Sequence, residues 1–269
     1  VISADSRQCY QELNIGVAKP SLQQLNDIPH YFINTHHITE TVTAADFEHY
    51  ALGIAADLFA AHDVIVMAGG TGLYINAFAQ GMDNIPAVPA FVRDNIKKEV
   101  KEGGFAWLKA ALEAEDSNYS QKGDMHNPQR MMRALEVIRQ TGTSILDFQK
   151  GQKKNRDFNI IYLGIETERQ ELYQRIEHRV DEMILQGLVA EVNALRPYSE
   201  LNAMKTVGYT EILDYLSGKI TLPEAIKLVK QHTRNYAKRQ VTWFKKNPNV
   251  SWMALEDIFS YATQYAIKK

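Results

Sequence analysis

The sequence is poor in cysteine and has no apolar run of membrane length. Cys9 is the one cysteine among 269 residues, so no disulfide can form within this sequence, and a reducing cytoplasm is the location we expect. No apolar stretch approaches the roughly 18 residues that a membrane-spanning helix needs, and no signal peptide is visible, so we expect no membrane association. A small apolar side chain beside a strand is more often packed than reactive, and Cys9 is therefore interpreted as a packing residue.

Metal-ligand spacing and a strong net charge are also missing. The histidines show no zinc pattern, since His36 and His37 are adjacent, and the absence of a Cys-x-x-Cys pair excludes a zinc deaminase. The formal net charge is -2, so any binding of nucleic acid would require a local basic face. Such a face is present between Thr221 and Asn247, where Glu224 is the single acid. The cations of this stretch are Lys227, Lys230, Arg234, Lys238, Arg239, Lys245 and Lys246.

Polar segments directly follow two apolar runs of strand length. Residues 1–4 are interpreted as a strand and lead into Asp5-Ser6-Arg7-Gln8, while residues 64–68 lead into a glycine-rich turn that contains Thr71. In open α/β sheets, ligands bind beyond the carboxyl ends of the strands. If the two strands are parallel neighbours, Asp5 and Thr71 emerge at the same edge and form a small polar site there.

The alternation of strands and helices predicts an α/β fold. A helical pattern over residues 46–61 separates the first two strands, and residues 158–165 supply a third apolar run, which together are typical of a parallel sheet. Further predicted elements of this core are helices at 168–195, 210–216, 222–246 and 255–267 and a short strand at 249–253.

The stretch between the second and third predicted strands is helical in pattern. Helices are predicted at 91–102, 106–114 and 128–141. The last of them has a favourable start at Asn127-Pro128 and a favourable stop at Gly142. We therefore expect two parts, an α/β core formed by residues 1–92 and 158–269 and a helical insertion domain formed by residues 93–157.

Asp5 and Thr71 are the sharpest candidates for chemistry, and each has a plain structural alternative. A carboxylate with the usual pKa of about 3.9 is ionised at neutral pH and can take a proton, but Asp5 could equally cap the next turn. The backbone N–H groups around Thr71 could face an anion, but Gly-Gly-Thr-Gly could equally be an ordinary strand-to-helix turn. The residues alone leave both choices open.

Three basic segments could contact phosphate groups. Arg175 and Arg179 lie four apart on one helix face and could clamp a diphosphate, although a solvated face paired with glutamates is the more frequent arrangement. Arg130 and Arg133 could meet phosphates, and a surface salt-bridge face is an equal alternative. The stretch 235–244 interleaves cations with aromatic residues, a mixture that suits phosphate contact and base stacking.

Six segments in series resemble the tRNA dimethylallyltransferase (tRNA isopentenyltransferase) family. They occur in the family's order and span nearly the whole chain, so the series is specific although each segment alone is weak. The segments are Ile2-Ser3-Ala4-Asp5-Ser6-Arg7-Gln8, Gly16-Val17-Ala18-Lys19-Pro20, Gly69-Gly70-Thr71-Gly72-Leu73-Tyr74, Pro128-Gln129-Arg130-Met131-Met132-Arg133-Ala134-Leu135-Glu136, Lys205-Thr206-Val207-Gly208-Tyr209 and Ala237-Lys238-Arg239-Gln240-Val241-Thr242-Trp243-Phe244.

The resemblance implies a fold, a reaction and residue roles. The core would be P-loop-NTPase-like, and the reaction would move a dimethylallyl group from dimethylallyl diphosphate to N6 of adenine-37 in the tRNA anticodon stem-loop, with that base flipped out. Asp5 would be the general base, Thr71 would lie at the reacting centre, and Gly70, Thr71 and Arg179 would bind the diphosphate. The implied tRNA contacts are Asp5, Ser6, Arg7, Gln8, Arg93, Gln129, Arg130, Arg133, Lys205, Thr210, Lys238, Arg239, Gln240 and Lys245.

The sequence departs from this family at one motif. The family carries a P-loop, G-x-x-x-x-G-K-[ST], just before the strand that here is residues 1–4, and no such motif occurs in this sequence. We expect that residues precede Val1. The P-loop and the diphosphate would hold Mg²⁺, and no metal ligands are visible in the sequence itself. A monomer is expected.

Three other functions stay open on the sequence. A related transferase could act on free adenine nucleotides, but it would need neither the helical insertion nor the basic stretch from Arg234 to Lys246. A non-catalytic RNA-binding relic could have lost its P-loop. A P-loop kinase for small molecules could use Thr71 and Arg179, but would have less need of Asp5.

Overall fold

The computed structural model describes residues 1–266 and divides the chain into two compact units. The core unit comprises Val1–Gln80 and Arg156–Lys269, and the helical unit comprises Gly81–Asn155. The sequence placed these borders at 93 and 157. The segment 81–89 belongs with the helical unit because Ile85 and Val88 pack against its apolar cluster. No helix within residues 1–266 has the length and apolar character needed to cross a membrane.

The strands of the core unit form two parallel pairs. They are β1 (Ile2–Ser3), β2 (Met67–Ala68), β3 (Tyr162–Ile165) and β4 (Val250–Met253). β1 pairs with β2, with Ile2 opposite Met67, so the predicted parallel arrangement of the first two strands is confirmed. β3 pairs with β4 and not with β1 or β2, so within the described residues the third predicted strand belongs to a second parallel pair and not to a sheet with the first two.

The second strand is also shorter than the apolar run that predicted it. Residues 64–66 lie outside β2, and the side chains of Val64 and Val66 are exposed. Val66 still contributes its carbonyl, which accepts a hydrogen bond from the Ile2 N–H at 2.9 Å. A strand assignment requires a ladder of backbone hydrogen bonds to a neighbour, and apolar side chains alone do not supply one.

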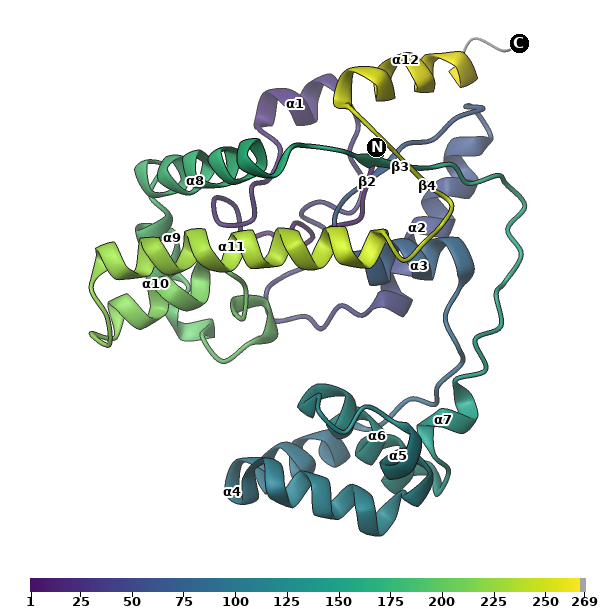
Figure 1. Ribbon diagram of the computed structural model, residues 1–269, viewed down its shortest axis with the longest axis vertical. Coiled ribbons are helices and arrows are strands. Elements are labelled where there is room, and N and C mark those ends of the chain that lie inside the picture. The colour runs from purple at the N-terminus through teal and green to yellow at the C-terminus, as the bar shows by residue number, and fades with distance from the viewer. Residues whose placement is uncertain (267–269) are drawn as a thin grey trace. The chain divides into compact units, whose positions relative to one another are not determined.

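The helices of the core unit surround these strand pairs (Figure 1). They are α1 (Leu22–Asp27), α2 (Ala44–Phe59), α3 (Gly72–Gln80), α8 (Arg169–Leu185), α9 (Leu188–Ala194), α10 (Tyr209–Leu216), α11 (Leu222–Phe244) and α12 (Leu255–Ala266), with 3-10 turns at Arg196–Tyr198 and Asn202–Met204. The predicted closing helix extended to Ile267, which lies outside the described residues. α11 runs alongside α8 and also contacts α10.

Two features of the sequence explain helix α2 and its packing. Thr43 caps the first turn in a capping box with Asp46, so the orphan N–H groups at the helix start are satisfied. The apolar face then buries Phe47 against α3, where its ring stacks on Tyr74 with centroids 4.4 Å apart. This packing fixes α3, and therefore the glycine-rich turn before it, against the rest of the core.

The predicted continuous helix over 168–195 is wrong. Gly187 has a φ of 99°, in the left-handed region that favours glycine, and it separates α8 from α9. A single glycine within a helical pattern is often tolerated, so the pattern alone did not reveal the break.

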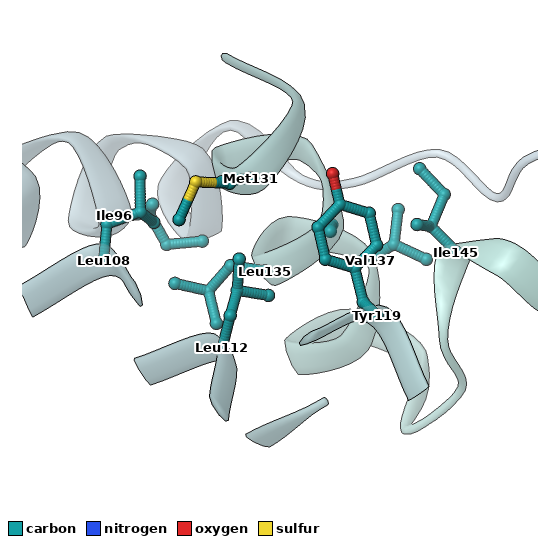
Figure 2. Close-up of a cluster of buried hydrophobic side chains, with 9 residues drawn as sticks. Ile96, Leu108, Leu112, Tyr119, Met131, Leu135, Val137 and Ile145 are labelled. Atoms are coloured by element: carbon teal, nitrogen blue, oxygen red, sulfur yellow. The ribbon is translucent and has the colours of Figure 1, made fainter. Parts of the chain in front are cut away.

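The helical unit is organised around one apolar cluster. Its helices are α4 (Ala90–Glu115), α5 (Ser117–Lys122), α6 (Pro128–Thr141) and α7 (Ile145–Phe148). α4 bends at Gly104, whose φ is 69°, so the two predicted helices of this stretch are confirmed as two segments. Leu108, Leu112 and Leu135 are fully buried where α4 packs on α6 (Figure 2). Asn127 caps α6 as predicted, and Gly142 ends it in the left-handed conformation.

Arg156 fixes the return of the chain to the core unit. Its guanidinium donates to the carbonyls of Phe78, at 2.7 Å, and Ala77, at 2.9 Å, which lie in the last turn of α3. It also donates to the carboxylate of Glu48 on α2 at 2.9 Å, and both side chains are nearly buried. A cation that satisfies the last carbonyls of a helix also complements the helix dipole, so Arg156 fastens α3 to α2.

Candidate active site

The segments that carry Asp5 and Thr71 meet at the end of the β1–β2 pair. The backbone N–H of Ser6 donates to Oγ1 of Thr71 at 3.1 Å, and the N–H of Thr71 donates to the carbonyl of Ala4 at 3.1 Å. The structure therefore brings together the two segments that the sequence placed at one sheet edge.

The carboxylate of Asp5 serves the turn that follows it. Oδ1 accepts hydrogen bonds from the N–H groups of Arg7, at 2.7 Å, and Gln8, at 3.2 Å. This is the capping arrangement that the sequence left open as the alternative. Within the described residues Oδ2 has no hydrogen-bond partner, and the residue is partly exposed. One oxygen is thus held by the backbone, which orients the carboxylate and leaves the other oxygen for a substrate.

Thr71 stands immediately before helix α3. Its carbonyl accepts from the N–H groups of Tyr74, at 2.9 Å, and Ile75, at 3.2 Å, so it forms the start of the helix. Its hydroxyl oxygen accepts from Ser6, which leaves the hydroxyl proton to be donated elsewhere. The start of a helix carries the positive end of the helix dipole, which favours an anion.

The glycines of this turn allow close packing. A Cβ on Gly69 would collide with the carbonyl of Ala4, and one on Gly72 would collide with the indole of Trp243. A Cβ on Gly70 would collide with the side-chain amide of Gln240, which donates to the Gly70 carbonyl at 3.1 Å. Helix α11 therefore lies directly on the turn. Gln240, a predicted tRNA contact, uses its amide to position Gly70.

Gln8 ties the Asp5 segment to the loop over residues 16–20. Its amide nitrogen donates to the carbonyls of Val17, at 3.2 Å, and Ala18, at 3.1 Å, and its amide oxygen accepts from the hydroxyl of Ser3 at 3.0 Å. The side chain is thus engaged within the protein. Its predicted contact with tRNA stays a prediction.

Glu191 is a site-supporting residue that the sequence did not reveal. Its carboxylate accepts from the N–H groups of Ile15, at 2.9 Å, and Gly16, at 3.2 Å, and from the hydroxyl of Tyr209 at 2.6 Å. Burial, followed by the charge of Glu191, raises the pKa of Tyr209 well above its ordinary value, so the phenol stays a donor. No motif announces this contact because its members are about 175 positions apart in sequence.

Lys19 is the second such residue. Its ammonium donates to Oδ1 of Asn14 at 3.2 Å and also contacts the carbonyl of Tyr10 and Oδ1 of Asn34. Burial lowers the pKa of Lys19 to about 8, partly offset by the charge of Glu191. Lys19 belongs to Gly16-Val17-Ala18-Lys19-Pro20, one of the six segments that resemble the family, but the resemblance implies no role for it.

Cys9 is buried, as the sequence predicted. Burial first, and the charge of Asp5 second, raise the pKa of its thiol to about 12. Because the thiolate is the reactive form, a thiol with this pKa does not act as a nucleophile near neutral pH.

Arg179 lies on helix α8 with an exposed side chain. No hydrogen bond or ion pair within residues 1–266 engages it, whereas Arg175 lies 4.0 Å from the carboxylate of Glu171. The structure records no contact between Arg179 and the Asp5–Thr71 pair. The predicted diphosphate role of Arg179 therefore stays a prediction.

The predicted tRNA-contacting arginines of the helical unit form internal ion pairs. Arg130 pairs with Asp124 at 2.9 Å. Arg133, at 3.0 Å, and Arg93, at 3.4 Å, share the carboxylate of Glu136, which is nearly buried. The salt-bridge alternative is therefore realised here. Gln129 on the same helix is exposed.

The predicted cations of α11 and its C-terminal end lie beside aromatic rings. Lys238 lies 5.8 Å from the ring of Tyr173, Arg239 lies 5.6 Å from Tyr236, and Lys245 lies 6.0 Å from Trp252. Cations in this setting keep their full charge, since a ring attracts them without neutralising them.

Two further predicted tRNA contacts lie at and near the start of α10. The side chain of Lys205 is exposed, and the hydroxyl of Thr210 donates to the carbonyl of Thr206 at 3.3 Å.

For the metal, no group of three or more His, Cys, Asp or Glu side chains among the described residues could hold an ion.

Comparisons with known proteins agree with the segments named above. A profile described as IPP transferase matches residues 8–247. The tRNA dimethylallyltransferase 1 of Bacteroides thetaiotaomicron is 42% identical over 252 residues, which cover 94% of this chain and 82% of that protein. The tRNA dimethylallyltransferase of Christiangramia forsetii is 40% identical over 265 residues, which cover 97% and 88%.

Solved structures extend the likeness to the fold. The full-length tRNA isopentenylpyrophosphate transferase of Bacillus halodurans has a TM-score of 0.68 at 30% identity. The match spans 98% of this chain and 87% of the Bacillus halodurans chain. A eukaryotic dimethylallyltransferase acting on tRNA has a TM-score of 0.73 at 23% identity, covering 99% and 70%, and shows likeness of fold. The predicted α/β, P-loop-NTPase-like class is confirmed by these structures. With a profile match over most of its length and relatives this similar, the chain belongs to the IPP transferase family.

Proposed function

We propose that this protein transfers a dimethylallyl group from dimethylallyl diphosphate to N6 of adenine-37 in tRNA. The observation that carries the proposal is the meeting of the Asp5 and Thr71 segments beyond β1 and β2, where the N–H of Ser6 donates to Oγ1 of Thr71, in a chain whose relatives are named tRNA dimethylallyltransferases. The pair offers a proton acceptor and a hydroxyl donor next to the positive end of a helix.

Asp5 acts on the attacking nitrogen. The exocyclic amino group of adenine is a weak nucleophile because its lone pair is delocalised into the ring. As nitrogen bonds to C1 of the dimethylallyl group, the carbon–oxygen bond breaks and diphosphate leaves, while Asp5 takes the proton from nitrogen. The hydrogen bonds from Arg7 and Gln8 hold Oδ1, so Oδ2 faces the amino group without reorganising. The adenine reaches this site flipped out of the anticodon stack.

Thr71, Gly70 and Arg179 act on the leaving group. The Thr71 hydroxyl has a proton to donate, and the N–H groups at the start of α3 favour an anion. Arg179 is free to form a charge-assisted pair with a phosphate oxygen. Mg²⁺ would accompany the diphosphate and neutralise its charge, and we assign no residue of this chain as its ligand.

The anticodon stem-loop of tRNA is the proposed macromolecular substrate. Its contacts come from Asp5–Gln8, from the helical unit and from the cations of α11, which are the segments named from the sequence. We propose that the protein acts as a monomer in the cytoplasm, where the single cysteine stays reduced.

The decisive experiment compares Asp5→Asn with Asp5→Ala in the full-length protein. An asparagine keeps an oxygen that can accept from Arg7 and Gln8, but it cannot take a proton. If Asp5 is the base, both variants lower the single-turnover rate with radiolabelled dimethylallyl diphosphate by about 10²–10⁴-fold, and binding of the stem-loop changes little.

Three results would contradict the proposal. If Asp5→Asn keeps the wild-type rate while Asp5→Ala does not, Asp5 only caps the turn. If the wild type prenylates free adenosine monophosphate in preference to the stem-loop, the substrate is a nucleotide. If it binds RNA without any transfer, the protein is a non-catalytic RNA-binding relic.

A further inference from the structure

Helices α8 and α11 are joined by a ladder of ion pairs. Lys230 pairs with Asp181 at 2.7 Å, and one turn further along α11, Arg234 pairs with Glu177 at 2.7 Å. Positions four apart lie on the same face of a helix, and each step toward the end of α11 matches a step toward the start of α8. The two helices are therefore antiparallel along this seam, as Figure 1 shows.

The third rung of the ladder has a tyrosine where the first two have an acid. Lys238 follows Arg234 by four positions, and Tyr173 precedes Glu177 by four. The ammonium of Lys238 lies 5.8 Å from the Tyr173 ring, and the guanidinium of Arg234 lies 5.9 Å from it. Arg169 completes the group, at 5.3 Å from the ring, and its Nε donates to the tyrosine hydroxyl at 3.1 Å.

The charges of this rung are not neutralised. Within residues 1–266 no carboxylate pairs with Arg169 or Lys238, and both side chains are exposed. The nearby Glu168 is occupied in capping α8, where it accepts from the N–H groups of Gln170 and Glu171.

The pKa of Tyr173 is consistent with this excess of positive charge. Slight burial raises the pKa, but the hydrogen bonds from Arg169 and Lys238 and their positive charges outweigh it, and the pKa falls below its ordinary value.

We propose that Arg169, Tyr173 and Lys238, here called the third rung, bind one backbone phosphate of the RNA substrate. This inference rests on the proposed function, because it adds a contact for the same tRNA. It brings in Arg169 and Tyr173, which no motif singled out, and it explains why a tyrosine takes the place of an acid.

The chemistry of the third rung suits a phosphodiester. A guanidinium presents paired N–H donors, an ammonium supplies a point charge, and both bond phosphate oxygens strongly. The Tyr173 ring holds the two cations apart without cancelling their charge, and the face is open to solvent, as a long polymer requires. Arg239 and Lys245 continue the cationic stretch toward the C-terminal end of α11, so a strand would meet several charges in series.

The test compares two double variants on the same pair of helices. The double variant Arg169→Gln with Lys238→Gln removes both positive charges of the third rung. The double variant Lys230→Gln with Asp181→Asn removes the ion pair of the first rung, Lys230 with Asp181, and leaves the net charge unchanged. Filter binding of an anticodon stem-loop across a range of salt concentrations measures the slope of log K against log salt. The third-rung variant should weaken binding and flatten the slope by about 0.7 for the one lost single-strand phosphate contact, whereas the first-rung variant should leave the slope unchanged. Tyr173→Phe should weaken binding by a smaller factor, because it removes only the hydroxyl.

The outcomes separate this inference from the proposed function. If the wild type transfers the prenyl group but the third-rung variant keeps its slope, the inference fails and the function stands. If the variant instead loses affinity for dimethylallyl diphosphate and keeps RNA binding, the phosphate belongs to the small substrate and the RNA assignment is overturned. If the wild type neither binds the stem-loop nor modifies it, the proposed function fails and this inference fails with it. A circular dichroism melt identifies any loss of folding, and Tyr173→Phe then provides the test.

Discussion

The cations that the sequence predicted to contact tRNA have different surroundings in the two units. In the helical unit, Arg130 and Arg133 are paired with Asp124 and Glu136. At the end of α11 in the core unit, Lys238, Arg239 and Lys245 lie beside aromatic rings and pair with no carboxylate of the described residues.

This difference indicates how each unit would meet a polyanion. A phosphate that approaches the helical unit must compete with an internal acid, so the gain in binding is the difference between two ion pairs. A phosphate that approaches the C-terminal end of α11 meets cations that no carboxylate of the described residues neutralises. Equal numbers of cations therefore need not contribute equally to RNA affinity, and a count from the sequence does not separate the two cases.

The largest effect is expected on the stability of the helical unit. Leu135 is fully buried in its apolar cluster, and Leu135→Ala should lower the free energy of unfolding by about 2–5 kcal/mol because it removes buried methyl groups and leaves a cavity. Leu185 in the core unit is 86% exposed, and Leu185→Ala should change stability by less than about 0.5 kcal/mol. Urea denaturation measures both. A similar loss in both variants would show that burial does not distinguish these positions.

The next effect concerns Arg179 on α8, which forms no ion pair within residues 1–266. Arg179→Ala should raise the KM for dimethylallyl diphosphate and slow the breaking of the carbon–oxygen bond to the diphosphate leaving group, by roughly 10- to 100-fold in kcat/KM, the worth of a charge-assisted hydrogen bond. Arg175→Ala is the matched control, because Arg175 is one turn away and faces Glu171. Steady-state kinetics with varied diphosphate substrate decides the matter, and unchanged constants for Arg179→Ala would return this residue to a solvated surface.

A smaller effect is expected when the paired arginines of the helical unit are removed. Arg130→Ala with Arg133→Ala should weaken binding of the stem-loop and flatten the salt slope by about one unit, with diphosphate binding unchanged. Lys97→Ala with Lys109→Ala removes the same charge from the same unit and serves as control. A slope equal to that of the wild type would mean that the helical unit does not hold RNA, and free-nucleotide transfer would become the leading alternative.

The smallest effect is a change of stability with pH in the core unit. The folded-state pKa of Cys9 is about 12 against an ordinary value of 9.0, so between these values the unfolded chain has lost a proton that the native protein keeps. Stability should therefore fall as pH rises above 9, by at most about 1.4 kcal/mol per pH unit from this group. Urea midpoints from pH 8 to pH 11 should show a shallower fall for Cys9→Ala. Equal slopes would indicate that other groups, such as the buried tyrosines, account for the whole change.

The helical unit was largely predictable from the sequence. Asn127, Pro128 and Gly142 bound α6 as their cap and turn preferences require, and the periodic apolar residues of α4 and α6 form the cluster. Such signals act over a few positions of chain, so they can be recognised without knowledge of the fold. The break at Gly187 shows the limit, because a glycine inside a helical pattern is equally compatible with continuity.

The sequence by itself determined the family segments, and it predicted that the first two strands, if they are parallel neighbours, bring the Asp5 and Thr71 segments to one edge. These follow from local patterns and from the geometry of strand ends, where side chains emerge at a common edge. Only the tertiary structure decided which charged side chains form ion pairs or hydrogen bonds within the protein and which remain without a partner. Glu191 reaches Gly16 across about 175 positions, and Glu136 rather than solvent receives Arg133. Ion pairs depend on distances between side chains of separate elements, and the order of residues along a chain does not encode those distances until the elements have packed.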